Sequence, residues 1–151
     1  MRLECACPDD LPQLTELLAL LFEQEAEFAP DQEKQCRGLE MLLADPARGR
    51  IYVAREGERV VAMASLLYTV STAEGGRAAL FEDLVVRPEH RGRGVGKALL
   101  GHVIEQARGD GILRLTLLTD ADNDRAQALY RKAGFSASPM RPMRLKLGGS
   151  T

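Results

Sequence analysis

Apolar residues near the start of the chain alternate with other residues, and they recur at helical spacing soon afterwards. Cys5 and Cys7 alternate with Glu4 and Ala6 behind Leu3. This period of two predicts a first strand with both cysteines on its buried face.

Two amphipathic helices are expected next. The first begins after Asp9 or Asp10, and its apolar face consists of Leu11, Leu14, Leu17, Leu18 and Leu21. The second is predicted over residues 32–43 and ends near "ADPARG". Its apolar side consists of Cys36, Leu39 and Leu43.

The pattern then changes to that of a β-meander. Residues 51–70 form two strand-rich runs on either side of "EGE". The stretch "TAEGGRA" marks a second turn before another strand-rich run over residues 79–86. We expect these runs to pair as antiparallel neighbours.

From Pro88 onward the pattern changes again. A glycine-rich loop precedes a helix over residues 94–108, and a strand at 112–118 is followed by a helix at 123–132. A strand, a helix and a strand in this order imply a parallel pair joined by a crossover. Residues 134–138 and 143–147 resemble two more short strands, and residues 148–151 are expected to be a frayed tail. The fold class is therefore α/β (α+β), with one domain over residues 1–147.

Composition narrows the functional classes. The chain has 151 residues, and 20 Lys and Arg against 22 Asp and Glu give a net charge of −2, without the basic excess typical of nucleic-acid binding. No apolar run approaches the roughly 20 residues that span a membrane. Three cysteines make an odd count, which favours reduced thiols and a cytoplasmic protein.

The glycine-rich loop contains the first candidate site. Gly92, Gly94 and Gly96 lie just before or within the start of a predicted helix, where several backbone N–H groups have no helical acceptor. Three cations, Arg91, Arg93 and Lys97, accompany them. This combination favours an anion, and a diphosphate fits it best. A glycine-rich turn with only a packing role is the alternative.

Other nucleotide and metal motifs fail on spacing. A Walker A loop would need glycine at Arg91 and Ser or Thr at Ala98, and a G-x-G-x-x-G fingerprint fails from Gly92 and from Gly94. The acidic stretch "DADND" resembles a calcium loop, but Arg125 stands where glycine is required. We therefore predict no metal.

Two longer motifs carry a family resemblance. Arg91, Gly94 and Gly96 fit R-x-x-G-x-G within "EDLVVRPEHRGRGVGKALL", and "LLTDADNDRAQALYRKAGF" contains N-x-x-A-x-x-L-Y-x-x-x-G-F. Over about 79–135 the chain resembles the GNAT superfamily of N-acetyltransferases, in its bacterial, single-domain form. The resemblance implies a mixed sheet of six to seven strands, antiparallel at first with a splayed parallel pair in the middle, flanked by about four helices.

The resemblance also implies a role for each site residue. The pyrophosphate of acetyl-coenzyme A (acetyl-CoA) would bind the loop residues Arg91, Gly92, Arg93, Gly94, Val95, Gly96 and Lys97. Backbone N–H groups of a bulged strand at Leu84, Val85 and Val86 would hold the thioester oxygen and the pantetheine amides. Asn123 would bind the pantetheine arm, and Tyr130 would protonate the departing thiolate.

Each of these roles has a structural alternative. Asp122 or Asn123 also suits the N-cap of the following helix, and Tyr130 also suits a core position. Strand alternation places Glu82 with Leu84 and Val86 on one face, where Glu82 is either the base or the ion-pair partner of an arginine.

The predicted function is the transfer of an acetyl group from acetyl-CoA to a primary amine by direct attack in a ternary complex. A covalent route through His90 or His102 and a cysteine is disfavoured. The acceptor is expected to be a small amine, and a homodimer is compatible with this function. The alternatives are a protein acceptor and a CoA-sensing module without turnover. Acidic residues that either attract a cationic acceptor or form a solvated surface are Glu23, Glu25, Glu27, Asp31 and Glu33.

Overall fold

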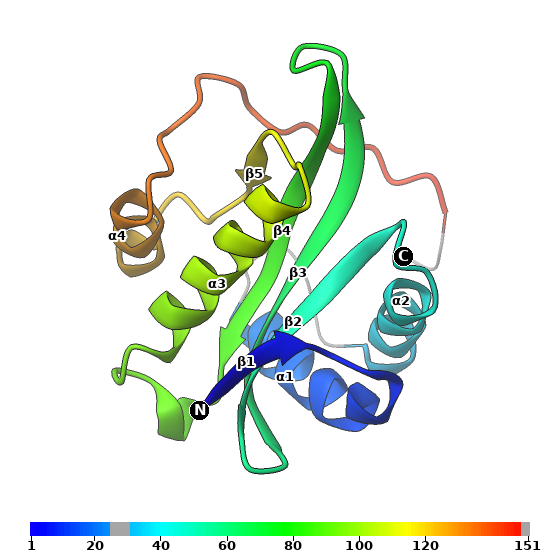
Figure 1. Cartoon of the computed structure of the whole chain (residues 1–151), viewed down its shortest axis with the longest axis vertical. Helices are drawn as coiled ribbons and strands as arrows, with labels where there is room; N and C mark the ends of the chain where they lie inside the picture. Colours follow the sequence, from blue (N-terminus) through cyan, green and yellow to red (C-terminus); the bar gives the residue numbers. More distant parts are fainter. Residues whose placement is uncertain (25–30, 149–151) are drawn as a thin grey trace.

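A computed structural model describes residues 1–24 and 31–148. Five strands form one sheet in the order β1-β2-β3-β4-β5 (Figure 1). The strands are β1 (Arg2–Cys5), β2 (Gly49–Glu56), β3 (Arg59–Ser71), β4 (Gly76–Val86) and β5 (Leu115–Leu117). The first four pair antiparallel, as the meander pattern predicts, and β4 pairs parallel with β5.

Helices cover both faces of this sheet. The α-helices are α1 (Leu11–Gln24), α2 (Gln32–Ala44), α3 (Val95–Gly109) and α4 (Asp124–Lys132), and the short 3-10 helices are η1 (Pro8–Asp10) and η2 (Pro88–His90). Helix α3 packs on one face, and α1 and α2 pack on the other (Figure 1). Helix α4 lies beyond α3, away from α1 and α2.

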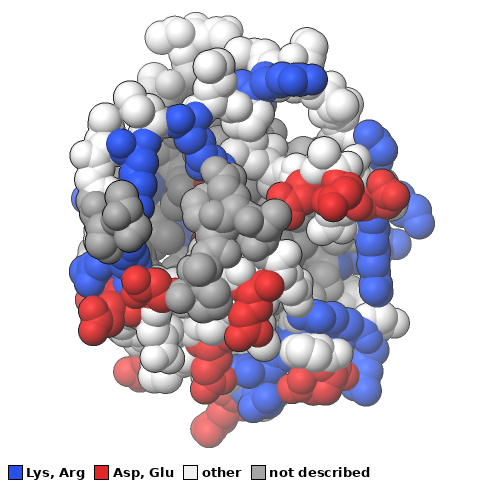
Figure 2. Space-filling view, turned by 180° about the vertical axis from the view of Figure 1, so that it is seen from behind, with Lys and Arg blue, Asp and Glu red and all other residues white. Residues whose placement is uncertain are grey.

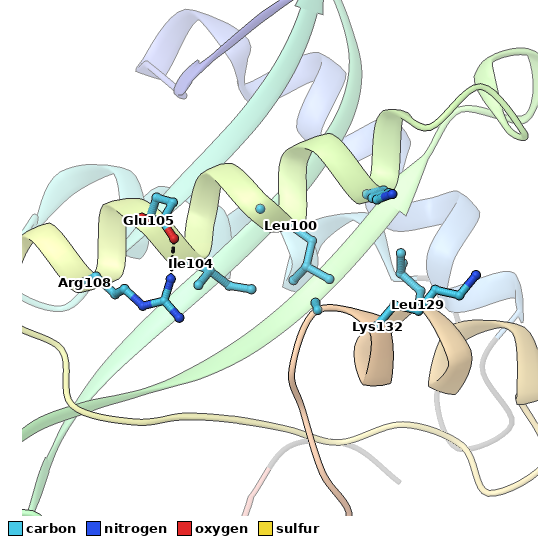
Figure 3. Close-up of a pocket in the computed structure, with 9 residues that line it drawn as sticks. Leu100, Ile104, Glu105, Arg108, Leu129 and Lys132 are labelled. Carbon is cyan, nitrogen blue, oxygen red and sulfur yellow. Dashed lines mark hydrogen bonds and ion pairs between the residues drawn. The ribbon is translucent and has the colours of Figure 1, made fainter.

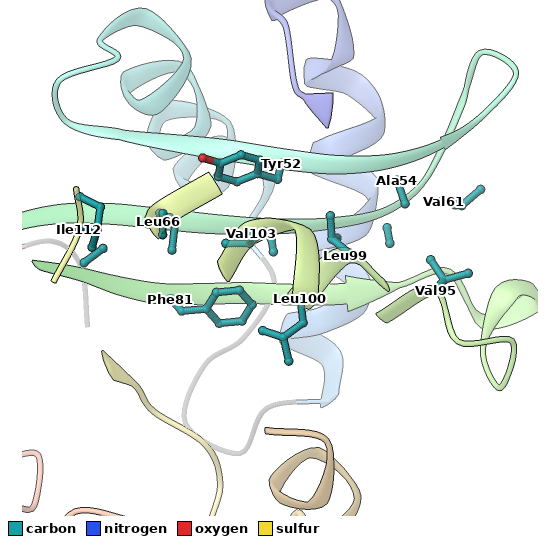
Figure 4. Close-up of a cluster of buried hydrophobic side chains, with 14 residues drawn as sticks. Tyr52, Ala54, Val61, Leu66, Phe81, Val95, Leu99, Leu100, Val103 and Ile112 are labelled. Carbon is teal, nitrogen blue, oxygen red and sulfur yellow. The ribbon is translucent and has the colours of Figure 1, made fainter. Parts of the chain in front are cut away.

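Each face has its own hydrophobic cluster. On the α3 side, Phe81, Leu99 and Val103 pack with side chains of the central strands (Figure 4). On the other side, Leu14 and Leu39 pack against Val53, Met63 and their neighbours. Because strand side chains alternate between faces, the nearly continuous apolar runs of β2 and β3 supply both clusters.

The parallel pair is short and opens at one end. Ala79, Leu80 and Phe81 pair with Leu115, Thr116 and Leu117. Beyond Phe81, β4 continues to Val86, and no described strand pairs with it on that side. The predicted splay of the parallel strands is confirmed.

A β-bulge interrupts β4 just where the splay begins. Ser65 pairs with Glu82, but Met63 pairs with Val85, so β4 contains one extra residue. Asp83 adopts a left-handed φ of 58° there.

The bulge corrects the predicted alternation of β4. Leu84 and Val86 join Phe81 on the α3 side, and Val85 packs on the α1 side. Glu82 lies across from Ser65 on the α1 side, so the prediction that it shares a face with Leu84 and Val86 is wrong. An extra residue shifts the period of two by one position, and the sequence pattern does not reveal it.

The predicted count of six to seven strands is also wrong. Residues 134–138 and 143–147 form no strand in the described chain, although their sequences alternate. A strand requires a hydrogen-bonded neighbour, and this segment pairs with none of the five described strands. The apolar side chains of residues 143–147 are consequently exposed, from 83% at Leu145 to 96% at Met143.

The cysteines of the first strand are likewise not in the core. Cys5 and Cys7 are exposed, and Cys36 is partly exposed. The strand β1 lies at the edge of the sheet and ends at Cys5, while Cys7 is the residue before η1. All three thiols are free, which confirms the prediction of reduced cysteines.

Charge of both signs is spread over the face seen in Figure 2. Acidic and basic side chains are interspersed there, in keeping with the small net charge of −2. Among the residues that the structure describes, no helix has the length and apolar character needed to span a membrane.

A buried ion pair connects the N-terminal segment to the sheet. The Arg55 guanidinium donates from Nη1 and Nη2 to the two Asp10 carboxylate oxygens, at 2.8 and 3.0 Å. The Cys7 backbone N–H donates to the same carboxylate at 2.9 Å. Hydrogen bonding from Arg55 is the main reason that the pKa of Asp10 falls to about 2.

This ion pair predicts acid-sensitive stability. The carboxylate stabilises the fold above its unfolded pKa of 3.8, and this contribution, about 2 kcal/mol, disappears as the pH falls through about 2. We expect Asp10→Asn to lower the free energy of unfolding by about 2 kcal/mol at pH 7, because it removes the buried carboxylate and leaves Arg55 with only the partly exposed Glu4 as its ion-pair partner. Urea denaturation at pH 7 and pH 2.5 measures both effects; an equal deficit of the variant at both pH values would contradict this account.

Candidate active site

The loop between β4 and α3 exposes backbone donors. Gly92 and Gly94 have φ values of 76° and 79°, a conformation that side chains other than glycine rarely adopt. Gly94 is the N-cap of α3 and contributes no side-chain cap. The first helical hydrogen bond runs from the Ala98 N–H to the Gly94 carbonyl at 3.0 Å, so the N–H groups of the three preceding residues have no acceptor within the helix.

The surroundings of these donors fit an anionic ligand. Arg91, Arg93 and Lys97 are all exposed around the loop. A methyl group placed at Gly94 would meet no described atom within 4 Å, so the loop faces open space. Donors, cations and open space together match the diphosphate of acetyl-CoA.

Two arginines hold the loop in place. Arg91 donates from Nε to the Val86 carbonyl at 3.0 Å. Arg87, which is only 6% exposed, donates from Nε to the Val60 carbonyl at 2.7 Å and pairs with Glu16 of α1 at 3.0 Å. Sequence analysis missed Arg87; an arginine directly after an apolar strand was the available signal.

A cleft runs between α3 and α4, beginning near the glycine loop (Figure 3). It has a volume of about 220 Å³. Leu100, Ile104 and Leu129 form its apolar walls, and Lys97 and Lys132 are among its polar lining residues. The sequence did not predict this cleft, because no local pattern fixes how far α4 lies from α3.

Asn123 caps the last helix. Its Oδ1 accepts a hydrogen bond from the Ala126 N–H at 3.1 Å, so the predicted N-cap is confirmed. Capping uses the oxygen of the side chain and leaves the Nδ2 donors for other partners. Asn123 is exposed and therefore accessible to a ligand.

Tyr130 lies two turns further along α4 and packs toward the sheet. Its ring makes edge-to-face contacts with Phe81 and Phe135, at centroid distances of 6.2 and 5.8 Å. Burial raises the pKa of the Tyr130 phenol above its usual value. The phenol therefore keeps its proton at neutral pH, as an acid must.

Glu82 lies at the opening of the splay. It is half-buried, and within the described residues its carboxylate forms no hydrogen bond or ion pair, so the alternative of an arginine partner is not formed there. Tyr130 contacts Phe81 on the α3 side of β4, and Glu82 lies on the α1 side. The two groups thus flank β4 where it loses its parallel neighbour.

The acidic residues near the end of α1 are only partly described. Glu25 and Glu27 lie outside the described residues. Asp31 caps α2 by accepting from the Lys34 N–H at 3.2 Å, which is a structural role. Among the described residues, no cluster of three His, Cys, Asp or Glu side chains is placed to bind a metal ion.

Comparison with known proteins assigns most of the chain to the family that its motifs resemble. The family model "Acetyltransferase (GNAT) family" matches residues 11–135. Glucosamine 6-phosphate N-acetyltransferase of Trypanosoma brucei brucei is 35% identical over 99 residues, which are 65% of this chain and 65% of that protein. An uncharacterized N-acetyltransferase of Bacillus subtilis is 31% identical over 121 residues, or 78% of this chain and 80% of that one.

A solved structure of an acetyltransferase from Trypanosoma brucei is similar too, with a TM-score of 0.74 at 30% identity over 97% of this chain and 99% of that one. The chain spans less than two thirds of the trypanosome glucosamine 6-phosphate enzyme and less than half of some other curated relatives. The family match nonetheless includes the glycine loop, the splayed strands and both helices that border the cleft. This chain belongs to the acetyltransferase (GNAT) family.

Proposed function

We propose that this protein transfers the acetyl group of acetyl-CoA to the nitrogen of a primary amine. The observation that carries the proposal is a pair of neighbouring sites with unpaired backbone groups. One is the set of N–H groups in the first turn of α3, and the other is the free edge of β4 between Glu82 and Val86. A long ligand with a diphosphate at one end and amides along its arm complements both sites.

The parts of acetyl-CoA are assigned to separate elements. The diphosphate binds the loop from Arg91 to Lys97, where the helix dipole adds about 0.3 to 1 kcal/mol per interacting charge. The pantetheine arm lies along the free edge of β4 in the manner of an added strand, held by N–H groups of residues 84–86 and by Nδ2 of Asn123. The acetyl group then lies at the splay, between Glu82 and Tyr130.

Chemistry at this position requires a base and an acid. An amine with a pKa near 10 is only about 0.1% neutral at pH 7, a deficit of about 4 kcal/mol. Glu82 takes a proton from the ammonium, and the freed lone pair attacks the thioester carbon. The carbon–sulfur bond breaks as Tyr130 donates its proton to the leaving thiolate. The nitrogen, positively charged after the attack, gives its second proton to the Tyr130 phenolate, which leaves a neutral amide and restores the phenol. Transfer is direct, in a complex that holds both substrates.

We propose a small amine as the acceptor. The trypanosome relative is named for a small amino sugar, whereas another relative in Mycobacterium tuberculosis is named as an N-alpha-acetyltransferase. Thiol release with a panel of small amines and of peptides distinguishes the two classes, and no release with any amine would favour a CoA-sensing module. A cytoplasmic location and a homodimer stay predictions of the sequence.

Gly96 offers the sharpest test of the diphosphate site. A methyl group there would lie 3.5 Å from Val86 Cγ2, an ordinary contact, so Gly96→Ala should fold normally. We expect it to weaken acetyl-CoA binding at least about tenfold, because the methyl group would stand among the backbone N–H donors that bind the diphosphate. Calorimetric titration measures the affinity, and Gly109→Ala at the other end of α3, outside the cleft, is the matched control. If Gly96→Ala binds acetyl-CoA with wild-type affinity, the diphosphate does not bind at this loop.

Tyr130→Phe isolates the proposed acid. The ring contacts with Phe81 and Phe135 persist, so the melting temperature and the affinity for acetyl-CoA should not change. We expect kcat to fall by up to about 10²- to 10⁴-fold if proton donation limits the rate. Steady-state kinetics that show full kcat in this variant would return Tyr130 to a packing role.

Glu82→Gln isolates the proposed base. The rate should fall most near neutral pH and recover partly at high pH, where solvent deprotonates the acceptor amine. The pH dependence of kcat/KM for an accepted amine, compared between wild type and variant, measures this recovery. A deficit of the same size at every pH would mean that Glu82 does not act as the base.

A further inference from the structure

Ser65 is a polar residue in an apolar part of the sheet. It is 0% exposed, and its hydroxyl has no hydrogen-bond partner in the described structure. Its neighbours Ala64 and Leu66 face α3, so Ser65 faces α1 and α2. On that face its nearest side chains along and across the strands include Met63 and Ile51, both buried in the α1-side cluster.

An unpaired hydroxyl in this position is costly for the fold. Burial of a hydroxyl without a hydrogen bond destabilises the fold, and alanine would avoid this cost. Packing therefore gives no reason for serine here. Polar groups left unpaired in a stable core commonly mark a site where a ligand or water completes the hydrogen bonds.

The cross-strand neighbour of Ser65 is Glu82. The two residues are direct partners in the β3–β4 ladder, so their Cβ atoms lie about 4.5 to 5.5 Å apart on one face. Regular pairing from Ser71–Gly76 onward sets this contact, and the bulge at Asp83 follows it, so that Leu84 turns to the other face while Glu82 stays beside Ser65. Ser65 and Glu82 thus form a small polar pair among apolar side chains.

We propose that Ser65 is a positioning residue that holds a water molecule against Glu82, which makes Glu82 a base that acts through water. This inference rests on the proposed acetyltransferase function. The Ser65 O–H donates to the water oxygen, the water donates to the Glu82 carboxylate, and the acceptor ammonium donates to the same water. Three partners of this kind are typical of a water held inside a protein.

The proton transfer balances in one step. The ammonium gives its proton to the water as the water gives one of its own to Glu82. The amine regains its lone pair, the water is unchanged, and the carboxylate becomes a carboxylic acid. Ser65 exchanges no proton and fixes only the position of the water.

Ser65→Ala tests the proposal with two opposite expectations. We expect kcat to fall about tenfold to a hundredfold, a part of the roughly 10²- to 10⁴-fold that general base catalysis provides. The KM for acetyl-CoA should not change, because Ser65 lies on β3 and faces α1 and α2, away from the cluster that contacts Tyr130. The melting temperature should stay the same or rise, because the variant removes an unpaired buried hydroxyl.

Four further variants separate positioning from packing. Ser65→Thr keeps a hydroxyl and should restore most of kcat. If the methyl group that threonine adds lowers the melting temperature, Ser65→Cys, which is nearly the size of serine, serves the same purpose. Adding Ser65→Ala to Glu82→Gln should cost less than about twofold more, since both act on one proton transfer. Tyr52→Phe removes a buried hydroxyl from the opposite face and should leave kcat unchanged.

The outcomes are distinguishable. Wild-type protein that releases no thiol with any amine overturns the proposed function and the role of Ser65 together. Active wild type with full kcat in Ser65→Ala overturns only the role of Ser65. A lower melting temperature with unchanged kcat would assign Ser65 to packing.

Discussion

The loss of a neighbouring strand beyond Phe81 is the constraint on which the site depends. Up to that residue β4 is paired on both edges, and from Glu82 to Val86 one edge has no described strand beside it. Backbone groups along a free edge need partners, and an extended ligand with amides can supply them. The short helix η2 and the glycine loop follow this edge and lead to the first turn of α3, whose N–H groups have no acceptor within the helix.

The bulge at Asp83 changes which side chains of β4 face each side of the sheet. A left-handed φ at a non-glycine residue costs about 1 to 2 kcal/mol, although aspartate tolerates it better than most residues. In return Phe81 and Leu84 both face α3, and Glu82 stays on the other face beside Ser65. A regular strand would point Glu82 and Leu84 the same way, and Leu84 and Val86 would then face α1 instead of the α3 cluster.

The periodicity of the sequence predicted those helices and strands that local side-chain patterns determine. The leucine spacing of α1, the helix after the glycine loop and the meander of β2 to β4 follow from side-chain patterns that match the observed elements. Three features were not predicted from the sequence, because they depend on pairing between distant residues. Residues 143–147 alternate like a strand but find no neighbour, Cys5 lies at an uncovered edge, and the bulge reverses the faces that alternation assigns to Leu84 and Val86.

Helix α4 differs from the other helices in how little it buries. None of its nine residues, all within the described chain, is fully buried, and Tyr130 and Leu129 are its apolar contacts with the α3-side cluster. Such an element opens locally at low free energy, well below that of global unfolding. If a ligand lies between α3 and α4, its binding free energy adds to the free energy that is needed to open α4 locally. The amide hydrogens of α4 would then exchange with solvent more slowly as a larger fraction of the protein holds the ligand. Their exchange rate would therefore measure the bound fraction.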